Sequence, residues 1–122
     1  MAKKILIIDD EPEVVRLLVT ELESHGYEVE TANDGMAGFE KAKELVPDIV
    51  LLDVIMPGWS GFETASRLNA HPKTYDIPII FITAMSNESS AGKYLGKSRF
   101  SYLFKPFRFS ELLAILNNVY GL

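Results

Sequence analysis

The sequence predicts an α/β protein built on a parallel sheet, and two observations support this fold class. Short runs of aliphatic and aromatic residues recur along the chain, and continuous apolar runs of this kind are typical of strands buried on both faces. Stretches with helical periodicity separate these runs. Strict alternation of strand and helix predicts a parallel sheet that is covered by helices on both faces and connected by right-handed crossovers.

Five segments are predicted to be strands. They span residues 4–9, 27–32, 48–53, 78–83 and 100–104. The first, third and fourth of these segments each contain four consecutive apolar residues and then end in a polar one. The polar residues are Asp9, Asp53 and Thr83, and Lys105 directly follows the fifth segment.

Five further segments are predicted to be helices. They span residues 12–24, 35–45, 61–69, 88–96 and 110–120. In the first and last of them, apolar residues follow the i, i+3, i+4, i+7 spacing of an amphipathic helix. Pro12 suits a first helical turn, Gly26 follows the end of the first helix, and Ser110 is predicted to cap the last one.

The segment 88–96 has the weakest helical pattern. It contains Gly92 and Gly96, and each glycine costs about 1 kcal/mol relative to alanine in a helix interior.

The composition describes an ordinary globular domain. The 122 residues are 48% hydrophobic and 24% charged, which is enough to bury one core, and no linker or change in composition marks a second domain. We therefore expect a single domain over residues 1–122, without an output domain. The absence of cysteine excludes disulfides and thiolate metal sites. Since no apolar run is long enough for a signal peptide or a membrane span, a cytoplasmic protein without membrane contacts is expected.

Charge is distributed unevenly along the chain, whose net charge is −5. Residues 1–85 contain seven lysines and arginines against fifteen acidic residues, whereas residues 86–122 contain five against two. A largely acidic body argues against direct binding of nucleic acid by this domain. The basic C-terminal third leaves room for an acidic partner on one face.

Carboxylates are predicted to meet at one edge of the sheet. Asp9 and Asp10 end the first strand and Asp53 ends the third, and ligands of open α/β sheets bind beyond the carboxyl ends of the strands. If these two strands are neighbours, the carboxylates repel one another unless a cation binds. An oxygen-only ligand set with open coordination positions favours Mg²⁺.

This combination of residues suits phosphoryl transfer. An aspartate beside Mg²⁺ can attack phosphorus and form an acyl phosphate. Lys105 would supply a second positive charge to neutralise the phosphoryl oxygens, and Thr83 offers a hydroxyl donor from the fourth strand.

Less specific interpretations exist for each residue. Asp9 and Asp10 could cap the first helix, Lys105 could be a solvated lysine, and a threonine at a strand end is common. A flavin or nucleotide carrier would need a glycine-rich phosphate loop after the first strand, where this chain has acidic residues. A phosphatase of the haloacid-dehalogenase type would need an acidic residue at the position of Ile55.

The motifs taken together resemble the receiver domain of response regulators in two-component signal transduction. The matching segments are Ile7-Ile8-Asp9-Asp10-Glu11, Asn33-Asp34-Gly35, Leu51-Leu52-Asp53-Val54-Ile55-Met56-Pro57-Gly58, Gly61-Phe62-Glu63, Pro78-Ile79-Ile80-Phe81-Ile82-Thr83-Ala84 and Lys105-Pro106-Phe107. They occur in order over the whole chain. The resemblance implies a flavodoxin-like (βα)5 three-layer sandwich with strand order 2-1-3-4-5.

The resemblance also implies the function and the site. Asp53 would accept a phosphoryl group from the phosphohistidine of a sensor histidine kinase or a histidine phosphotransfer protein. A receiver promotes its own phosphorylation and dephosphorylation and is not a dedicated enzyme. The implied Mg²⁺ ligands are Asp10, Asp53, the backbone carbonyl of Ile55 and, mainly through water, Asp9. The implied phosphoryl-binding residues are Thr83, Ala84 and Lys105, with a cis peptide bond between Lys105 and Pro106.

A conformational switch is implied by the same resemblance. Phosphorylation would draw Thr83 toward the phosphoryl group and let Tyr102 rotate inward. This movement would alter a surface formed by the segments 88–96, 100–104 and 110–120, where a downstream protein partner would bind.

The chain departs from the family pattern in two places. Many receivers have an acidic stretch where this chain has Ser98-Arg99-Phe100-Ser101, so we hypothesise that Lys93, Lys97, Arg99 and Arg108 form a basic surface for an acidic partner. Ile55 and Met85 flank the expected site entrance, and both are apolar, so neither can orient a hydrolytic water. This predicts slow loss of the phosphoryl group.

Two alternatives remain open at the level of sequence. The chain could be a phosphorylation-independent interaction module that keeps a receiver fold. It could also be a stand-alone regulator or one part of a larger regulator or hybrid kinase.

Overall fold

A computed structural model describes residues 2–84 and 99–122 of the chain. Its elements, in chain order, are β1 (Lys4–Ile8), α1 (Pro12–Ser24), β2 (Glu28–Ala32), α2 (Gly35–Leu45), β3 (Ile49–Asp53), α3 (Gly61–Ala70), β4 (Ile79–Thr83), β5 (Phe100–Phe104), α4 (Phe109–Ala114) and the π-helix η2 (Ile115–Val119). The helix predicted at 88–96 lies outside the described residues. The label α4 therefore belongs to the helix predicted at 110–120.

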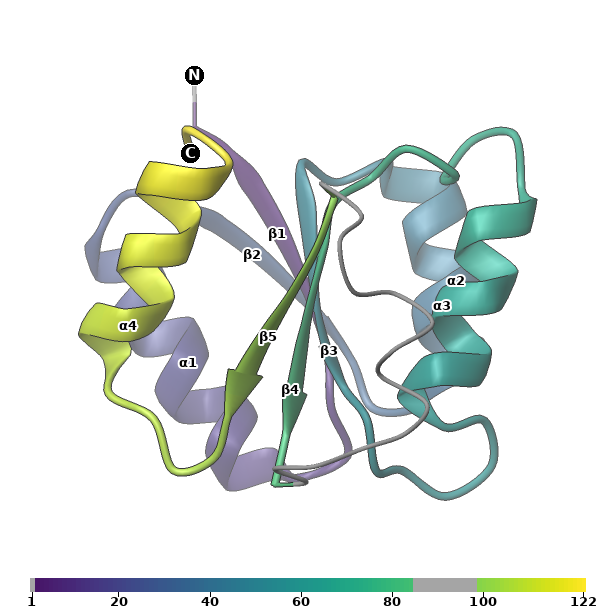
Figure 1. Cartoon of the computed structure of the whole chain (residues 1–122), viewed down its shortest axis with the longest axis horizontal. Coiled ribbons are helices and arrows are strands. Elements are labelled where there is room, and N and C mark those ends of the chain that lie inside the picture. The colour runs from purple at the N-terminus through teal and green to yellow at the C-terminus, as the bar shows by residue number, and fades with distance from the viewer. Residues whose placement is uncertain (1, 85–98) are drawn as a thin grey trace.

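The five strands form one parallel sheet in the order β2-β1-β3-β4-β5. This confirms the predicted flavodoxin-like α/β fold and its strand order. Strand order reverses between β1 and β3, which pair in parallel with Ile8 opposite Leu52. The residues that follow β1 and end β3 therefore meet at one edge, the place where ligands bind in open α/β sheets. Figure 1 shows the strand arrows pointing to this edge, opposite the C-terminus.

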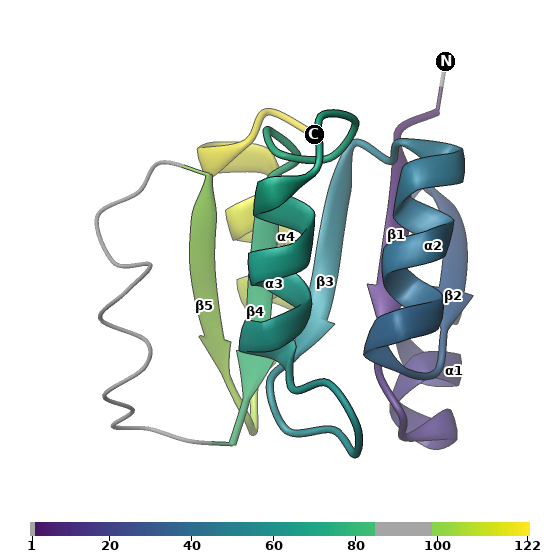
Figure 2. The same ribbon diagram turned by 90° about the vertical axis from the view of Figure 1, so that its right-hand side faces the viewer.

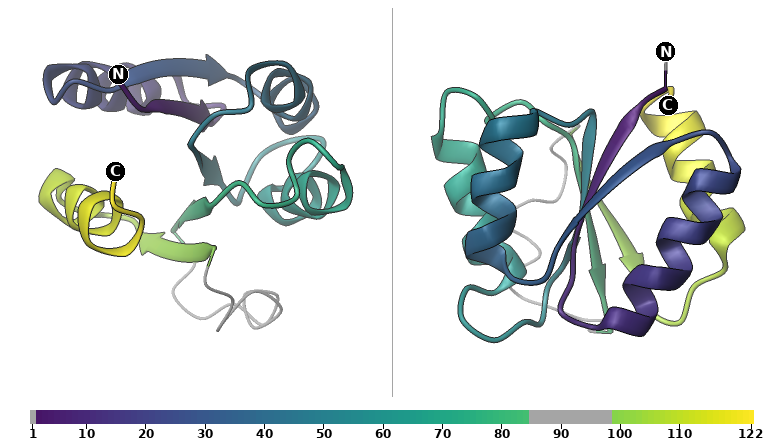
Figure 3. Two further views of the ribbon diagram at one scale, coloured as in Figure 1. Left: turned by 90° about the horizontal axis from the view of Figure 1, so that it is seen from above. Right: turned by 180° about the vertical axis from the view of Figure 1, so that it is seen from behind.

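Helices cover both faces of the sheet and complete three layers. Helices α1 and α4 with η2 pack on one face, and α2 and α3 pack on the other (Figures 1 and 2). The two further views in Figure 3 show the same division. Every residue of β3 and β4 is buried, as expected for central strands covered on both sides.

Alternate residues of each strand point into two separate cores. Leu6, Ile8, Leu52 and Phe81 belong to the core under α2 and α3, whereas Ile5, Ile7, Leu51 and Ile82 belong to the core under α1 and α4. This alternation is a consequence of the two-residue period of a strand. The two cores fix the register of the strands and hence the positions of the residues at their ends.

Several helix ends follow the predicted signals. Pro12 is the first residue of α1, and Gly26 follows this helix with a φ of +89°, in the left-handed region that glycine tolerates. At α2 the Asp34 carboxylate accepts a hydrogen bond from the Ala37 N–H at 2.7 Å. At α3 the Ser60 hydroxyl accepts one from the Glu63 N–H at 3.2 Å.

The C-terminal helix differs from the prediction in two respects. Ser110 lies inside α4 and does not cap it, because the helix begins at Phe109. The Glu111 carboxylate accepts a hydrogen bond from the Arg108 N–H at 2.9 Å and so satisfies one of the free N–H donors at this end. After Ala114 the helix widens into η2, whose end is marked by the Tyr120 N–H donating to the Ile115 carbonyl at 3.4 Å.

Within the part of the chain that the structure describes, no helix has the length and the apolar character that crossing a bilayer requires.

Candidate functional site

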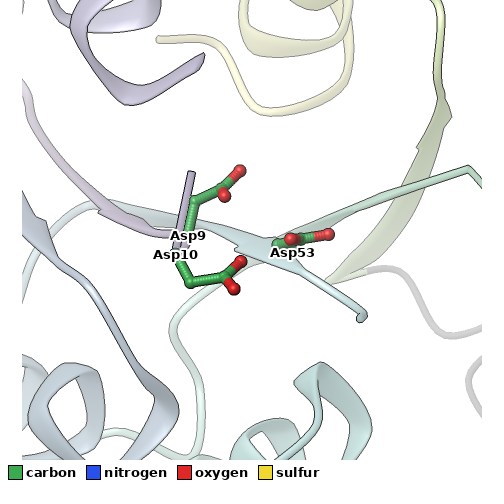
Figure 4. Close-up of side chains that lie close together, drawn as sticks. All are labelled: Asp9, Asp10 and Asp53. Carbon is green, nitrogen blue, oxygen red and sulfur yellow. The ribbon is translucent and has the colours of Figure 1, made fainter. Parts of the chain in front are cut away.

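Three carboxylates meet at the carboxyl edge of the sheet. Asp9 and Asp10 directly follow β1, and Asp53 is the last residue of β3. One carboxylate oxygen from each of the three residues lies within 4.8 Å of those of the other two. Figure 4 shows Asp9, Asp10 and Asp53 close together. Because β1 and β3 are neighbours in the sheet, Asp53 meets Asp9 and Asp10 although it lies 44 and 43 positions after them in the sequence.

The cluster has the chemistry of a site for a hard cation. Asp9 and Asp53 are buried, with exposed fractions of 2% and 4%. The Oδ1 atom of Asp9 accepts a hydrogen bond from the Glu11 N–H at 2.9 Å, whereas its buried Oδ2 atom has no hydrogen-bond partner among the described residues. A buried oxygen without a partner is costly, and a cation or the water bound to one would satisfy it. Three carboxylates without His or Cys fit Mg²⁺.

Electrostatic effects in the cluster raise two carboxyl pKa values. Burial raises the pKa of Asp53 from 3.8 to about 6, and the charge of Asp9 adds to this shift. Lys105 and the backbone of Ile55 offset part of it. Burial also raises the pKa of Asp9, although its hydrogen bond from Glu11 opposes the change. Burial and, to a smaller extent, mutual repulsion therefore disfavour the fully ionised cluster and favour a bound cation.

Lys105 lies across the site from the carboxylates. Its Nζ atom is 3.9 Å from Asp53 Oδ1 and 3.0 Å from Glu11 Oε1. Burial lowers the pKa of Lys105, but the hydrogen bond to Glu11 and the charges of Asp53 and Asp9 outweigh this effect and raise it overall. Lys105 therefore stays charged. Its backbone N–H donates to the Thr83 carbonyl at 2.7 Å, and its peptide bond to Pro106 is cis.

The other predicted site residues lie at the same edge of the sheet. Thr83 is buried at the end of β4, and the exposed Ala84 follows it. Ile55, two residues beyond Asp53, is 57% exposed. Met85, which was predicted to flank the entrance together with Ile55, lies outside the described residues.

Tyr102, the predicted switch residue, lies on β5 and is half-buried. Its ring stacks on those of Phe81, at a centroid distance of 5.1 Å, and Phe104, at 6.1 Å. Tyr102 thus belongs to a row of aromatic rings on the face of the sheet that α2 and α3 cover.

The predicted basic surface is described only in part, because Lys93 and Lys97 lie outside the described residues. The Arg99 guanidinium donates hydrogen bonds to the Ile77 carbonyl, at 2.5 Å, and to the Asn69 side chain. It also lies over the Phe100 ring, 4.4 Å from the centroid. These contacts give Arg99 a role within the domain that sequence reasoning did not anticipate.

Glu11 is the site residue that the sequence reasoning missed. Its carboxylate bonds to Lys105 at 3.0 Å although the two residues are 94 positions apart. The position of Glu11 directly after the acidic pair is the one signal that could have indicated it.

The fold and the site together define the class of protein. Residues 5–117 match the response regulator receiver domain family. The chain belongs to this family, whose receiver domains act in two-component signal transduction.

Individual relatives agree with this assignment. Protein PilH of Pseudomonas aeruginosa is 37% identical over 118 residues, which cover 95% of this chain and 96% of PilH. The DNA-binding dual master transcriptional regulator RpaA of Synechocystis sp. is 38% identical over 111 residues, which cover 91% of this chain. The chain spans 46% of the length of RpaA and half the length of the phosphate regulon regulator PhoB of Rhizobium meliloti.

A solved structure of a receiver domain is similar to this chain over its whole length. The receiver domain of the sensor histidine kinase PA1611 from Pseudomonas aeruginosa has a TM-score of 0.88 and 28% identity, with 100% of both chains covered. That domain contains a magnesium ion coordinated in its active site cleft.

Proposed function

We propose that this chain is a phosphoacceptor of a two-component system and that Asp53 receives the phosphoryl group. The donor would be the phosphohistidine of a sensor histidine kinase or of a histidine phosphotransfer protein. The observation that carries the proposal is the position of Asp53, which shares an acidic cluster with Asp9 and Asp10 and lies 3.9 Å from the Lys105 ammonium. A carboxylate between a cation site and an ammonium suits attack on phosphorus.

The acidic cluster would hold Mg²⁺. Asp10, Asp53 and the backbone carbonyl of Ile55 would bind the ion directly, and Asp9 would act mainly through water. When bound, the ion would neutralise the negative charge that the carboxylates and the phosphoryl oxygens bring together.

The side chains of this chain would perform the remaining steps. An Asp53 carboxylate oxygen would form a bond to phosphorus while the phosphorus–nitrogen bond to the donor histidine breaks. The donor ring would carry a proton on its other nitrogen, so that the nitrogen released from phosphorus keeps the electron pair and the imidazole leaves as the neutral base. Asp53 is ionised at pH 7 because its pKa is about 6. Lys105, Thr83 and Ala84 border the same edge of the sheet and would contact the phosphoryl oxygens.

Phosphorylation would then act on a surface for protein partners. The added charge would draw Thr83 toward the phosphoryl group, and Tyr102 would rotate inward. Tyr102 stacks between Phe81 and Phe104, so its rotation would change the surface along β5, where a downstream protein would bind. Direct binding of nucleic acid by this acidic domain is not part of the proposal.

Labelling with a small phosphodonor tests the proposal. Acetyl phosphate with Mg²⁺ is expected to add the mass of one phosphoryl group to the wild-type chain, and chelation of the metal should abolish the addition. Asp53→Asn should prevent it, whereas Asp76→Asn provides a matched control, since Asp76 is an exposed aspartate outside the site.

The result also separates the proposal from the alternative. Equal labelling of the wild-type chain and Asp53→Asn, or no labelling of either, would contradict phosphoacceptance at Asp53. If neither chain is labelled but partner binding is intact, the result would favour a phosphorylation-independent interaction module.

A further inference from the structure

The Lys105 ammonium lies closer to the carboxylate of Glu11 than to that of Asp53. Its Nζ atom lies 3.0 Å from the Glu11 carboxylate, within hydrogen-bonding distance, and 3.9 Å from the Asp53 carboxylate, beyond it. The Lys105 side chain is 23% exposed, so this is a partly desolvated ion pair. The lysine that would bind a phosphoryl group is thus held by another anion beside the site.

The backbones of both residues are anchored, so the pair has a defined geometry. The Glu11 N–H donates to Asp9 Oδ1 at 2.9 Å, and the Glu11 carbonyl accepts from the Val15 N–H at 3.1 Å in the first turn of α1. The Lys105 N–H donates to the Thr83 carbonyl at 2.7 Å. The two contacts of Glu11 involve its backbone and not its side chain. Substitution of the Glu11 side chain therefore leaves them in place.

We propose that Glu11 is a positioning residue that competes with the phosphoryl group for Lys105. The inference rests on the proposed function of Asp53 and adds a residue to it. Before phosphorylation, Glu11 holds the Lys105 ammonium away from Asp53. On phosphorylation, the lysine exchanges its hydrogen bond from the Glu11 carboxylate to a phosphoryl oxygen, and Glu11 returns to solvent.

The charges and exposures of the two anions favour this exchange. The Glu11 side chain is 58% exposed, so water compensates its carboxylate readily once the lysine leaves. A phosphoryl group carries more negative charge than a carboxylate and would lie on the buried Asp53. Glu11 therefore weakens binding of the phosphoryl group by a modest amount and does not prevent it.

Isothermal titration calorimetry tests this competition by measuring the affinity of the Mg²⁺-loaded chain for beryllofluoride, a phosphoryl mimic. Glu11→Ala is expected to bind the mimic about two- to fivefold more tightly than the wild-type chain, which is the effect of losing one partly exposed ion pair. Glu11→Gln keeps an acceptor oxygen without the charge and should give an intermediate affinity. Glu13→Ala is the matched control, because Glu13 is an exposed acid in the same helical turn and forms no salt bridge among the described residues.

A second background separates competition for the lysine from direct repulsion of the anion. In Lys105→Ala, the further change Glu11→Ala should leave the affinity for beryllofluoride unchanged. An equal gain in both backgrounds, or an equal gain from Glu13→Ala, would overturn the role of Glu11 while leaving the proposed function intact. A wild-type chain that binds no beryllofluoride would contradict the proposed function itself, and the competition with it.

Discussion

A Cβ atom on Gly61 would lie 2.4 Å from the backbone carbonyl oxygen of Asp53. It would also lie 2.7 Å from the Cα atom of Val54. The Gly61 N–H donates to the Val54 carbonyl at 2.8 Å, so the first residue of α3 rests directly on the end of β3. This contact between backbones leaves no space for a side chain and fixes the position of Asp53.

We predict that Gly61→Ala lowers the free energy of unfolding by about 1–3 kcal/mol, because the obstructing atoms belong to the backbone and cannot rotate away. The displaced end of β3 should also slow phosphorylation of Asp53. Urea unfolding and labelling by acetyl phosphate measure the two effects. Gly26→Ala is the control for a general loss of stability. Its Cβ atom would have open space, but the φ of +89° costs about 1–2 kcal/mol in alanine, so this variant is destabilised without the contact to Asp53. Equal labelling rates for the two variants would count against the contact.

The raised pKa of Asp53 predicts a dependence of stability on pH. Between pH 3.8 and about 6, the folded chain retains a proton on Asp53 that the unfolded chain releases. The free energy of unfolding therefore falls as the pH rises through this window, and the whole of this loss is present above about pH 6. Asp9 and Asp10 raise the pKa of Asp53, whereas Lys105 lowers it.

Asp53→Asn removes this cost. In metal-free buffer at pH 7 the variant should be more stable than the wild-type chain by about 1–3 kcal/mol, and the difference should disappear below about pH 4. Urea unfolding of both chains across this range measures the difference. A difference that does not vary with pH would show that burial of the Asp53 charge is not its cause.

Magnesium is expected to stabilise the fold, because it would bind the carboxylates in the folded chain and not in the unfolded one. At a concentration about 100 times the dissociation constant, the gain is about 2.7 kcal/mol. Thermal unfolding with and without chelator measures it. Asp10→Asn should lose most of the gain and Asp76→Asn should keep it, so equal gains for the two variants would place the ion elsewhere.

A hydrogen bond between β5 and the residue that follows η2 leads to a further prediction. The hydroxyl groups of Ser101 and Tyr120 lie 2.7 Å apart, and burial raises the pKa of Tyr120, so the phenol stays protonated. Tyr120→Phe should lower the free energy of unfolding by about 0.5–1.5 kcal/mol. Tyr75→Phe is the control, because Tyr75 is 56% exposed. Equal stability of the two variants in urea would contradict a contribution from this bond.

The sequence predicted β1, β3 and β4 because each is a buried apolar run that ends at a polar residue. Ile5 to Ile8 and Ile79 to Ile82 are continuous apolar runs, and the structure has β1 and β4 within one residue of the predicted bounds. The meeting of Asp9 and Asp53 follows from the strand order, which the resemblance to a family supplied.

The features that were missed depend on tertiary geometry. Glu11 and Lys105 are 94 positions apart, and their contact depends on how the fold places the segment after β1 next to the segment after β5. The π-helix after Ala114 was not predicted because its apolar spacing also fits an ordinary α-helix. Ser110 resembled a cap, but Glu111 bonds to the Arg108 N–H and the helix starts one residue earlier.

A crystal structure of the chain with Mg²⁺ and beryllofluoride is the most direct test of the proposed site. We predict beryllium bonded to a carboxylate oxygen of Asp53, with Mg²⁺ bound by Asp10, Asp53 and the backbone carbonyl of Ile55. The Lys105 ammonium should have left Glu11 and should contact a fluoride. Beryllofluoride bound to a different side chain, or Mg²⁺ bound away from the acidic cluster, would contradict phosphoacceptance at Asp53.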